Sequence, residues 1–253
     1  MVRGLELFRE HFAGYADRYI LIGGTACDLI MSEAGLSFRA TKDLDIVLCV
    51  EALDATFARA FWAFVKQGSY QVMEMASGKK QLYRFQRPKH GDYPFMLELF
   101  SRAPDALSVA DASHLTPIPV SDEVSSLSAI LLDDSYYAWI QGGKRQVNGL
   151  TVLGAEHLIP LKAKAWLELS ARKAAGETID SRDIRKHKND IFRLFNLLSP
   201  QPLPSVPDVV TADLTRFVDA VATESVDLKS LGIASRSLPA VLADLRVIYL
   251  GHA

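Results

Sequence analysis

The first half of the chain alternates between apolar residues at helical spacing and short apolar runs typical of buried strands. Helices are predicted at Leu5–Tyr15, from Ala26 to about Met31, and at Ala52–Gln67. Strands are predicted at Tyr19–Ile22, Asp43–Val50, Tyr70–Met75, Gln81–Gln86 and Phe95–Phe100. Because the two kinds of element are interleaved, the sequence predicts an α/β or α+β layer structure.

The second half of the chain has a mostly helical pattern. Ser101–Val120 is rich in Pro, Ser, Ala and Asp and is predicted to be irregular, while Val124–Tyr137 fits either a helix or a strand. Asn148-Gly149 predicts a turn before a short strand, Leu150–Leu153. Helices are predicted at Ala155–Lys173, Asp180–Leu198, Thr211–Ala222 and from Leu238 onward. The sequence therefore predicts a sheet domain of residues 1–154 and a helical domain of residues 155–253.

The composition is that of an ordinary globular protein, with 49% hydrophobic and 23% charged residues and a formal net charge of -2. The chain does not begin with an apolar signal region, and charges interrupt its later apolar runs. A cytoplasmic protein with no membrane contact is therefore expected. Cys27 and Cys49 each lie in an apolar segment, so both are expected to be reduced core residues.

A glycine turn joins the first predicted strand to the next predicted helix. Gly23 and Gly24 follow the strand, and Thr25 is the predicted N-cap of the helix. Such a turn exposes backbone N–H groups at the positive end of a helix dipole, where a phosphate can approach closely and accept a hydrogen bond from the Thr25 hydroxyl. The alternative is a strand-to-helix turn with no ligand.

Two carboxylates share one face of the second predicted strand. Residues two apart on a strand point the same way, so Asp43 and Asp45 project together while Leu44 projects to the other face. Like charges side by side are costly unless cations compensate, and Mg²⁺ prefers oxygen ligands. The alternative is a solvated strand edge whose acids pair with Arg39 and Lys42.

Glu98 is a single acid in an otherwise apolar predicted strand. A buried glutamate is rare unless a cation, a metal or solvent satisfies it. On a neighbouring strand it could add a third carboxylate to the pair formed by Asp43 and Asp45. The alternative is a salt bridge.

A glycine turn, an acid-x-acid strand and a later acid, in this order, resemble the nucleotidyltransferase superfamily and its pattern hG[GS]…Dh[DE]h. The resemblance implies a nucleotidyltransferase-type mixed sheet flanked by helices, with a C-terminal helical domain. It implies that Gly23, Gly24 and Thr25 hold a triphosphate. The metal ligands implied for two Mg²⁺ or Mn²⁺ ions are Asp43, Asp45 and Glu98, and Arg39 and Lys42 are the further candidates for nucleotide binding.

More narrowly, the chain resembles the AbiEii/MenT-like branch, nucleotidyltransferases of the toxin type. Its lysine and aspartate elements have counterparts in Leu158–Trp166 and Lys186–Ile191. By this resemblance Lys162 neutralises the triphosphate and Asp190 completes the site, with Lys164 as a rival because lysines two apart on a helix face different ways. Thr25 stands where Ser is usual, and the segment from Thr25 to Asp43 is longer than the pattern, so a base preference does not transfer.

The predicted helix Asp180–Leu198 carries polar residues on its apolar side. Asp183, His187 and Asp190 fall on the stripe that also holds Ile184, Ile191 and Leu194. Asp180 is a plausible N-cap. Basic residues cluster twice, at Lys79, Lys80, Arg84, Arg87 and Lys89 and at Arg182, Arg185, Lys186, Lys188 and Arg193. These clusters are either solvated faces or a local patch for an RNA acceptor.

The expected reaction moves a nucleotidyl group from a nucleoside triphosphate to an acceptor hydroxyl on RNA or tRNA, on a protein or on a small molecule. A toxin with a cognate antitoxin is one form of this expectation. The alternatives are a phosphotransferase that moves the γ-phosphate on the same fold, and a non-catalytic binding or toxin–antitoxin module.

Overall fold

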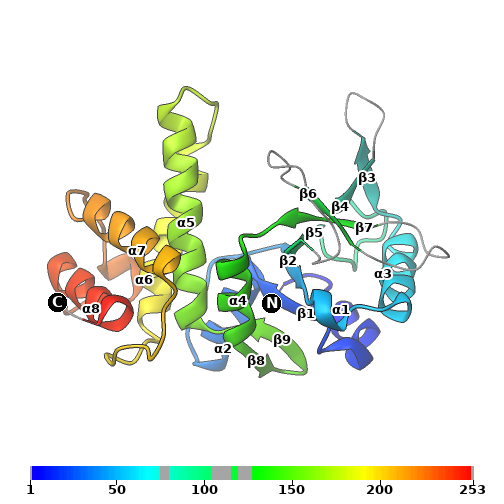
Figure 1. Cartoon of the computed structure of the whole chain (residues 1–253), viewed down its shortest axis with the longest axis horizontal. Coiled ribbons are helices and arrows are strands. Elements are labelled where there is room, and N and C mark those ends of the chain that lie inside the picture. Colours follow the sequence, from blue (N-terminus) through cyan, green and yellow to red (C-terminus); the bar gives the residue numbers. More distant parts are fainter. Residues whose placement is uncertain (1, 75–79, 104–114, 119–126, 252–253) are drawn as a thin grey trace. The chain divides into compact units, whose positions relative to one another are not determined.

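A computed structural model describes residues 2–74, 80–103, 115–118 and 127–251 (Figure 1). The chain divides into two compact units, Met1–Leu153 and Gly154–Ala253. The sequence placed the boundary after residue 154. The first unit contains every strand of the described residues, and the second contains helices alone.

The strands of the first unit form one mixed sheet. In the described part of the chain they are β1 (Tyr19–Ile22), β2 (Asp43–Leu48), β3 (Gln71–Glu74), β4 (Lys80–Gln86), β5 (Met96–Ser101), β6 (Leu115–Ile118), β7 (Leu127–Leu131), β8 (Lys144–Val147) and β9 (Leu150–Leu153). Their order is β3-β4-β5-β2-β1-β9-β8, and β7 pairs with both β5 and β6. The parallel partners β2 and β5 lie side by side near its middle, with the antiparallel neighbours β1 and β4 outside them.

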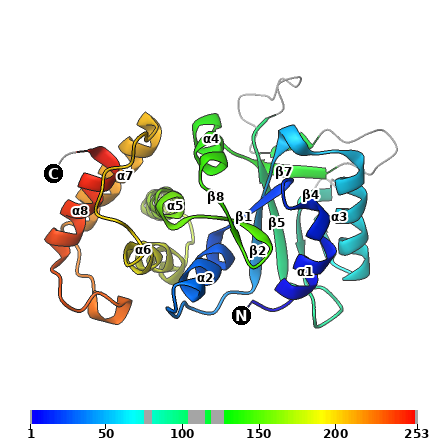
Figure 2. The ribbon, with the colours of Figure 1, turned by 90° about the horizontal axis from the view of Figure 1, so that it is seen from below.

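Helices cover both faces of this sheet. They are α1 (Leu5–His11), α2 (Gly23–Glu33), α3 (Ala55–Gln67) and α4 (Asp134–Gly142), with the short helices η1 (Ala13–Tyr15) and η2 (Val50–Ala52). Figure 2 shows α1 and α3 on one face and α2 on the other. An aromatic core joins α1 to α3, where the ring centroids of Phe8 and Phe64 lie 5.8 Å apart.

The alternation of side chains along the central strands decides which face carries the acids. In β2, Leu44 and Ile46 are buried, whereas Asp43 and Asp45 are half-buried. In β4, Phe85 packs edge-on against Phe61 and Trp62 of α3. Because alternate residues face opposite ways, the acids project from the face that α3 does not cover.

The second unit is a helical bundle. Its elements are α5 (Ala155–Ala174), α6 (Ser181–Phe195), α7 (Asp208–Val221), η3 (Lys229–Leu231) and α8 (Leu238–Leu250). Helix α5 packs against both α6 and α7, and α7 packs against α8. Buried apolar side chains from all four α-helices, among them Trp166 and Phe217, form its core.

A proline inside α5 is compensated by a tyrosine from α8. Pro160 has no N–H to donate to the carbonyl of Glu156, the acceptor four residues earlier. Tyr249 Oη donates to that carbonyl oxygen at 2.7 Å instead. Burial raises the pKa of Tyr249 well above its ordinary value, so the hydroxyl keeps the proton that it donates.

Several local predictions were wrong. Helix α2 begins at Gly23 with Ile22 as N-cap, so Thr25 lies inside the helix. Strand β6 lies in the stretch predicted to be irregular, and β8 was not predicted. Within the ambiguous stretch from residue 124, the described residues form β7 and then the start of α4. Asp180 is confirmed as the N-cap of α6, since its side chain accepts from the N–H of Arg182.

Both cysteines, Cys27 and Cys49, are buried thiols that form no disulfide, as expected for reduced core residues. In the described ranges, no helix combines the length and the apolar character needed to cross a membrane. The predicted mixed α/β architecture is confirmed.

Candidate functional site

The glycine turn brings the backbone of α2 against the carboxylate of Asp45. Gly23 has φ +67°, a conformation that glycine adopts without steric cost. A Cβ at this position would lie 1.7 Å from Asp45 Oδ2. A Cβ on Gly24 would lie 2.6 Å from Thr41 Oγ1. Both glycines are therefore required by close approach, and only a bare backbone fits beside the acid.

The start of α2 lies beside the carboxylate of Asp45. Its N-cap residue, Ile22, makes no side-chain hydrogen bond to the helix, and the first turn itself contains no acidic residue. Four N–H groups at a helix N-terminus lack helical partners, and the helix dipole favours negative charge there. Thr25 Oγ1 donates to the backbone oxygen of Asp43 at 2.7 Å, and this bond ties the turn to the first residue of β2.

Strand register sets three carboxylates close together on one face of the sheet. Asp45 pairs with Ile22 of β1 on one side and with Glu98 of β5 on the other. Asp43 lies two residues earlier on the same face. We call Asp43, Asp45 and Glu98 the acid row. The Oδ1 atom of Asp43 is buried and makes no hydrogen bond with another described residue, although the residue takes part in other interactions.

Glu98 forms an ion pair with Arg84 of β4, its register partner across the antiparallel pair. Arg84 Nε donates to Glu98 Oε1 at 2.5 Å, and Nη2 contacts the same oxygen. Of the partners expected for Glu98, the structure thus shows a salt bridge, to Arg84. A basic cluster around Arg84 was visible in the sequence, but the partner of Glu98 could not be assigned from it, because a single sequence does not show strand register.

Arg39 and Lys42 lie in the loop between α2 and β2. The Arg39 guanidinium carbon lies 5.2 Å from the centre of the Phe38 ring, and Nη2 lies 3.7 Å from the Cβ position of Gly24. Lys42 Nζ lies 4.1 Å above the Phe95 ring. Arg39 therefore lies beside the glycine turn, and Lys42 lies against an aromatic ring.

A divalent cation fits the acid row in part. Asp43 and Asp45 offer carboxylate oxygens on one face, and these are the ligands that Mg²⁺ prefers. Oε1 of the third acid, Glu98, is already held by Arg84. Among the residues that the structure describes, no group of three or more His, Cys, Asp and Glu side chains is arranged to hold a metal ion. The site thus presents two carboxylates and a third that is occupied by an arginine.

In the second unit, Lys162 and Asp190 form a buried ion pair between α5 and α6. Lys162 Nζ lies 3.2 Å from Asp190 Oδ2, and their side chains are 6% and 0% exposed. Arg193 Nη1 lies 3.5 Å from Asp190 Oδ1. Two cations therefore compensate a carboxylate that has no access to water.

Lys164 and the other polar residues of this unit are differently placed. Lys164 Nζ lies 3.7 Å from Asp213 of α7 and 3.3 Å from Glu168, so the two lysines face different helices. Asp183, expected on the apolar side of α6, is exposed and pairs with Lys186. It lies in the first turn of α6, and its side chain is exposed there.

The basic residues of α6 are largely engaged with acids. Arg182 pairs with Asp180, and Lys188 pairs with Glu224. Arg185 is exposed. Of the other basic cluster, Lys79 lies outside the described residues. Ion pairing of this kind is typical of a solvated face, so these residues give the RNA alternative no added support.

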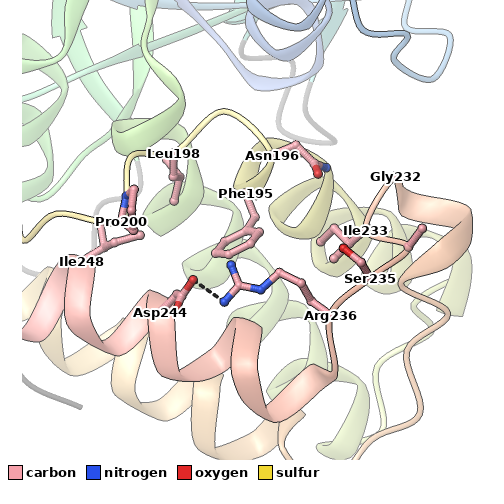
Figure 3. A pocket seen from close by; sticks show the side chains of 11 residues that line it. Phe195, Asn196, Leu198, Pro200, Gly232, Ile233, Ser235, Arg236, Asp244 and Ile248 are labelled. Atoms are coloured by element: carbon pink, nitrogen blue, oxygen red, sulfur yellow. Dashed lines mark ion pairs between the residues drawn. The ribbon is translucent and has the colours of Figure 1, made fainter.

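The second unit also contains a hollow of about 270 Å³ at the end of α6 (Figure 3). Its wall carries an ion pair between Arg236 Nη2 and Asp244 Oδ2 at 2.6 Å, and the Arg236 guanidinium lies over the Phe195 ring. None of the predicted site residues lines it. It therefore has no part in the acid row.

Within the first unit, the structure brings together Gly23, Gly24, Asp43, Asp45 and Glu98, and it adds Arg84 and Thr41 to them. Within the second, it joins Lys162 to Asp190. No protein-family model matches the chain, and no curated protein matches it. Its function has to be inferred from these residues and their geometry.

Proposed function

We propose that the chain is a metal-dependent nucleotidyltransferase, which moves a nucleotidyl group from a nucleoside triphosphate to an acceptor hydroxyl and releases pyrophosphate. The observation that carries the proposal is the contact between the glycine turn and Asp45, with Glu98 in register beside it. It places a helix N-terminus, which attracts phosphate, beside carboxylates, which attract cations.

The turn and α2 bind the phosphates. Gly23 and Gly24 are the first residues of this helix, and the N–H groups at a helix N-terminus favour phosphate oxygens. Arg39, beside the turn, adds a positive charge. Thr25 holds the turn to β2 through its bond to the backbone of Asp43. These contacts fix the phosphates relative to the acid row, and such positioning is a large part of catalysis in phosphoryl chemistry.

Asp43 and Asp45 would hold the divalent cations, which would supply positive charge beside the attacking and leaving oxygens. Glu98 either ligates one cation or accepts the proton of the acceptor hydroxyl. Both roles require a carboxylate within reach of the reacting atoms, and the register of β2 with β5 supports this placement. The acids thus bind cations, and Glu98 has the further option of moving a proton.

Lys162 and Asp190 enter the proposal through the sequence resemblance. Their buried pair supports a linked role, in which Asp190 sets the position of the Lys162 ammonium. That Lys162 neutralises the triphosphate stays a prediction, and so does the rival assignment to Lys164.

The test is transfer of label from each α-³²P nucleoside triphosphate, with Mg²⁺ and total RNA, by the wild type and by Asp45→Asn. The exposed Asp92 provides a control, Asp92→Asn, that removes the same charge elsewhere in the unit. Label on RNA or on protein that requires Asp45 but not Asp92 supports the proposal and names the nucleotide and the acceptor class. Equal transfer by Asp45→Asn overturns the metal assignment.

The same reaction with γ-³²P label separates the alternatives. Label from the γ position on an acceptor, with none from the α position, indicates a phosphotransferase on this fold. Absence of Mg²⁺-dependent nucleotide binding indicates a non-catalytic module, including one that acts with an antitoxin.

A further inference from the structure

The ion pair between Arg84 and Glu98 closes the acid row on the side of β4. Glu98 is almost buried, with a side chain 12% exposed, whereas the Arg84 side chain is 37% exposed. Both guanidinium contacts go to one oxygen, Oε1. Arg84 is therefore the more exposed partner, and it contacts one of the two carboxylate oxygens of Glu98.

An arginine in this position acts in opposite ways on the two ligands of the proposed reaction. Its positive charge competes with a divalent cation for the carboxylate of Glu98, so it weakens metal binding. The same charge attracts phosphate, and the planar guanidinium can hold two phosphate oxygens at once. Arg84 lies two strand spacings from Asp45, about 10 Å, which a triphosphate and an extended arginine side chain span together.

We propose that Arg84 exchanges partners, holding Glu98 in the protein alone and a phosphate of the nucleotide when it is bound. The exchange frees Glu98 for the cation, so phosphate binding and metal binding support each other. This inference rests on the proposed function and adds a phosphate-binding residue to it. The partial exposure of Arg84 lets the side chain turn without removing a buried core contact.

Two separate binding measurements on the full chain test the exchange. Mn²⁺ is titrated without phosphate and followed by electron paramagnetic resonance, and tripolyphosphate is titrated in the presence of EDTA and followed by calorimetry. We expect Arg84→Gln to bind Mn²⁺ roughly three- to tenfold more tightly and tripolyphosphate more weakly by a similar factor. Arg84→Lys keeps the positive charge but loses the planar guanidinium that can bind two phosphate oxygens at once. Only its affinity for tripolyphosphate should therefore fall.

A matched control removes the same charge from a neighbouring position. Arg87 lies just beyond the end of β4 and is exposed. Arg87→Gln is expected to leave both affinities close to those of the wild type, because its charge is screened by solvent and salt. Equal effects of Arg84→Gln and Arg87→Gln would mean that only the overall charge matters, and the exchange would be wrong.

A double-mutant cycle tests the partner change itself. Glu98→Gln releases Arg84, so it should raise the affinity for tripolyphosphate without metal. The rise should be absent when Glu98→Gln is combined with Arg84→Gln. A rise of the same size in both backgrounds, or no tripolyphosphate binding by Glu98→Gln, overturns the exchange.

Asp45→Asn separates this inference from the proposed function. If Asp45→Asn leaves Mn²⁺ binding unchanged, the proposed metal site fails, and the exchange fails with it. The expected result is instead that Asp45→Asn weakens Mn²⁺ binding. If it does, and Arg84→Gln changes the affinities for Mn²⁺ and tripolyphosphate in the same direction, or changes neither, the exchange alone is wrong.

Discussion

The two units arrange their charged residues in opposite ways. In the first, three carboxylates gather on one face of the sheet, two of them half-buried and the third nearly buried. In the second, Asp190 is fully buried, but Lys162 and Arg193 lie beside it. Like charges in a row raise the free energy of the folded protein, whereas a buried carboxylate with two cations is compensated.

The two charged groups also differ in what each one joins. The pair of Lys162 and Asp190 joins α5 to α6, so its presence has a structural explanation whatever else it does. The acid row has an arginine at one end and a glycine turn pressed against its middle. Proteins keep such unfavourable groupings mainly where they are used, and this favours the acid row as the functional centre.

The largest expected effect comes from Asp45→Asn. It should lower nucleotidyl transfer by about 10³-fold, about 4 kcal/mol, because the carboxylate that faces the glycine turn loses its charge. The free energy of unfolding should not fall, since one like charge is removed from the row. The transfer rate and a denaturant titration of the same preparation measure the two predicted quantities, activity and free energy of unfolding. If the free energy of unfolding falls together with the activity, Asp45 has a structural role, and the proposed difference between the two units is wrong.

Asp190→Asn should have the opposite pattern. It leaves Lys162 charged and buried, so we expect it to lower the free energy of unfolding by about 3 kcal/mol. Denaturant titration measures this loss. The double variant Lys162→Met/Asp190→Leu should recover most of it, because two apolar side chains replace the pair. Unchanged stability with abolished transfer would instead make the pair part of the catalytic machinery.

Two glycines with similar backbone conformations give a finer test. Gly23 and Gly35 have φ of +67° and +73°, but only Gly23 has a neighbour where a Cβ would be placed. Gly35→Ala should therefore cost about 1 kcal/mol of backbone strain and leave phosphate binding unchanged. Gly23→Ala should cost more and weaken tripolyphosphate binding, since the new Cβ displaces Asp45. Thermal unfolding and calorimetry on both variants measure the difference.

Much of the fold could be predicted because its signals are local. Strand β1 and helix α5 have strong apolar patterns, and both were found close to their observed ends. Strands β6 and β8 were missed because four-residue strands with a proline or several charges carry little pattern. The start of α2 was predicted three residues late, because threonine is a common N-cap residue but the Thr25 hydroxyl bonds to the backbone of β2 instead.

The candidate site was predictable only in the parts that lie close in sequence. Asp43 and Asp45 share a face by strand geometry alone. The pairing of Glu98 with Arg84 depends on which strands are neighbours and in what register, and one sequence does not contain this information. The partner of Lys162 was likewise invisible, because it lies on another helix.

The second unit contains one more polar group whose partner is supplied by another helix, and the last prediction concerns it. The carbonyl of Glu156 lacks a helical donor at Pro160 and accepts from Tyr249 instead. Tyr249→Phe removes that donor and leaves the buried carbonyl without one, so we expect the free energy of unfolding to fall by about 1–2 kcal/mol. Tyr15→Phe is the control, because its hydroxyl is exposed and bonds at 3.5 Å. Equal unfolding midpoints for the two variants would show that solvent or backbone adjustment satisfies Glu156. The compensation that distinguishes this unit from the acid row would then be weaker than its contacts indicate.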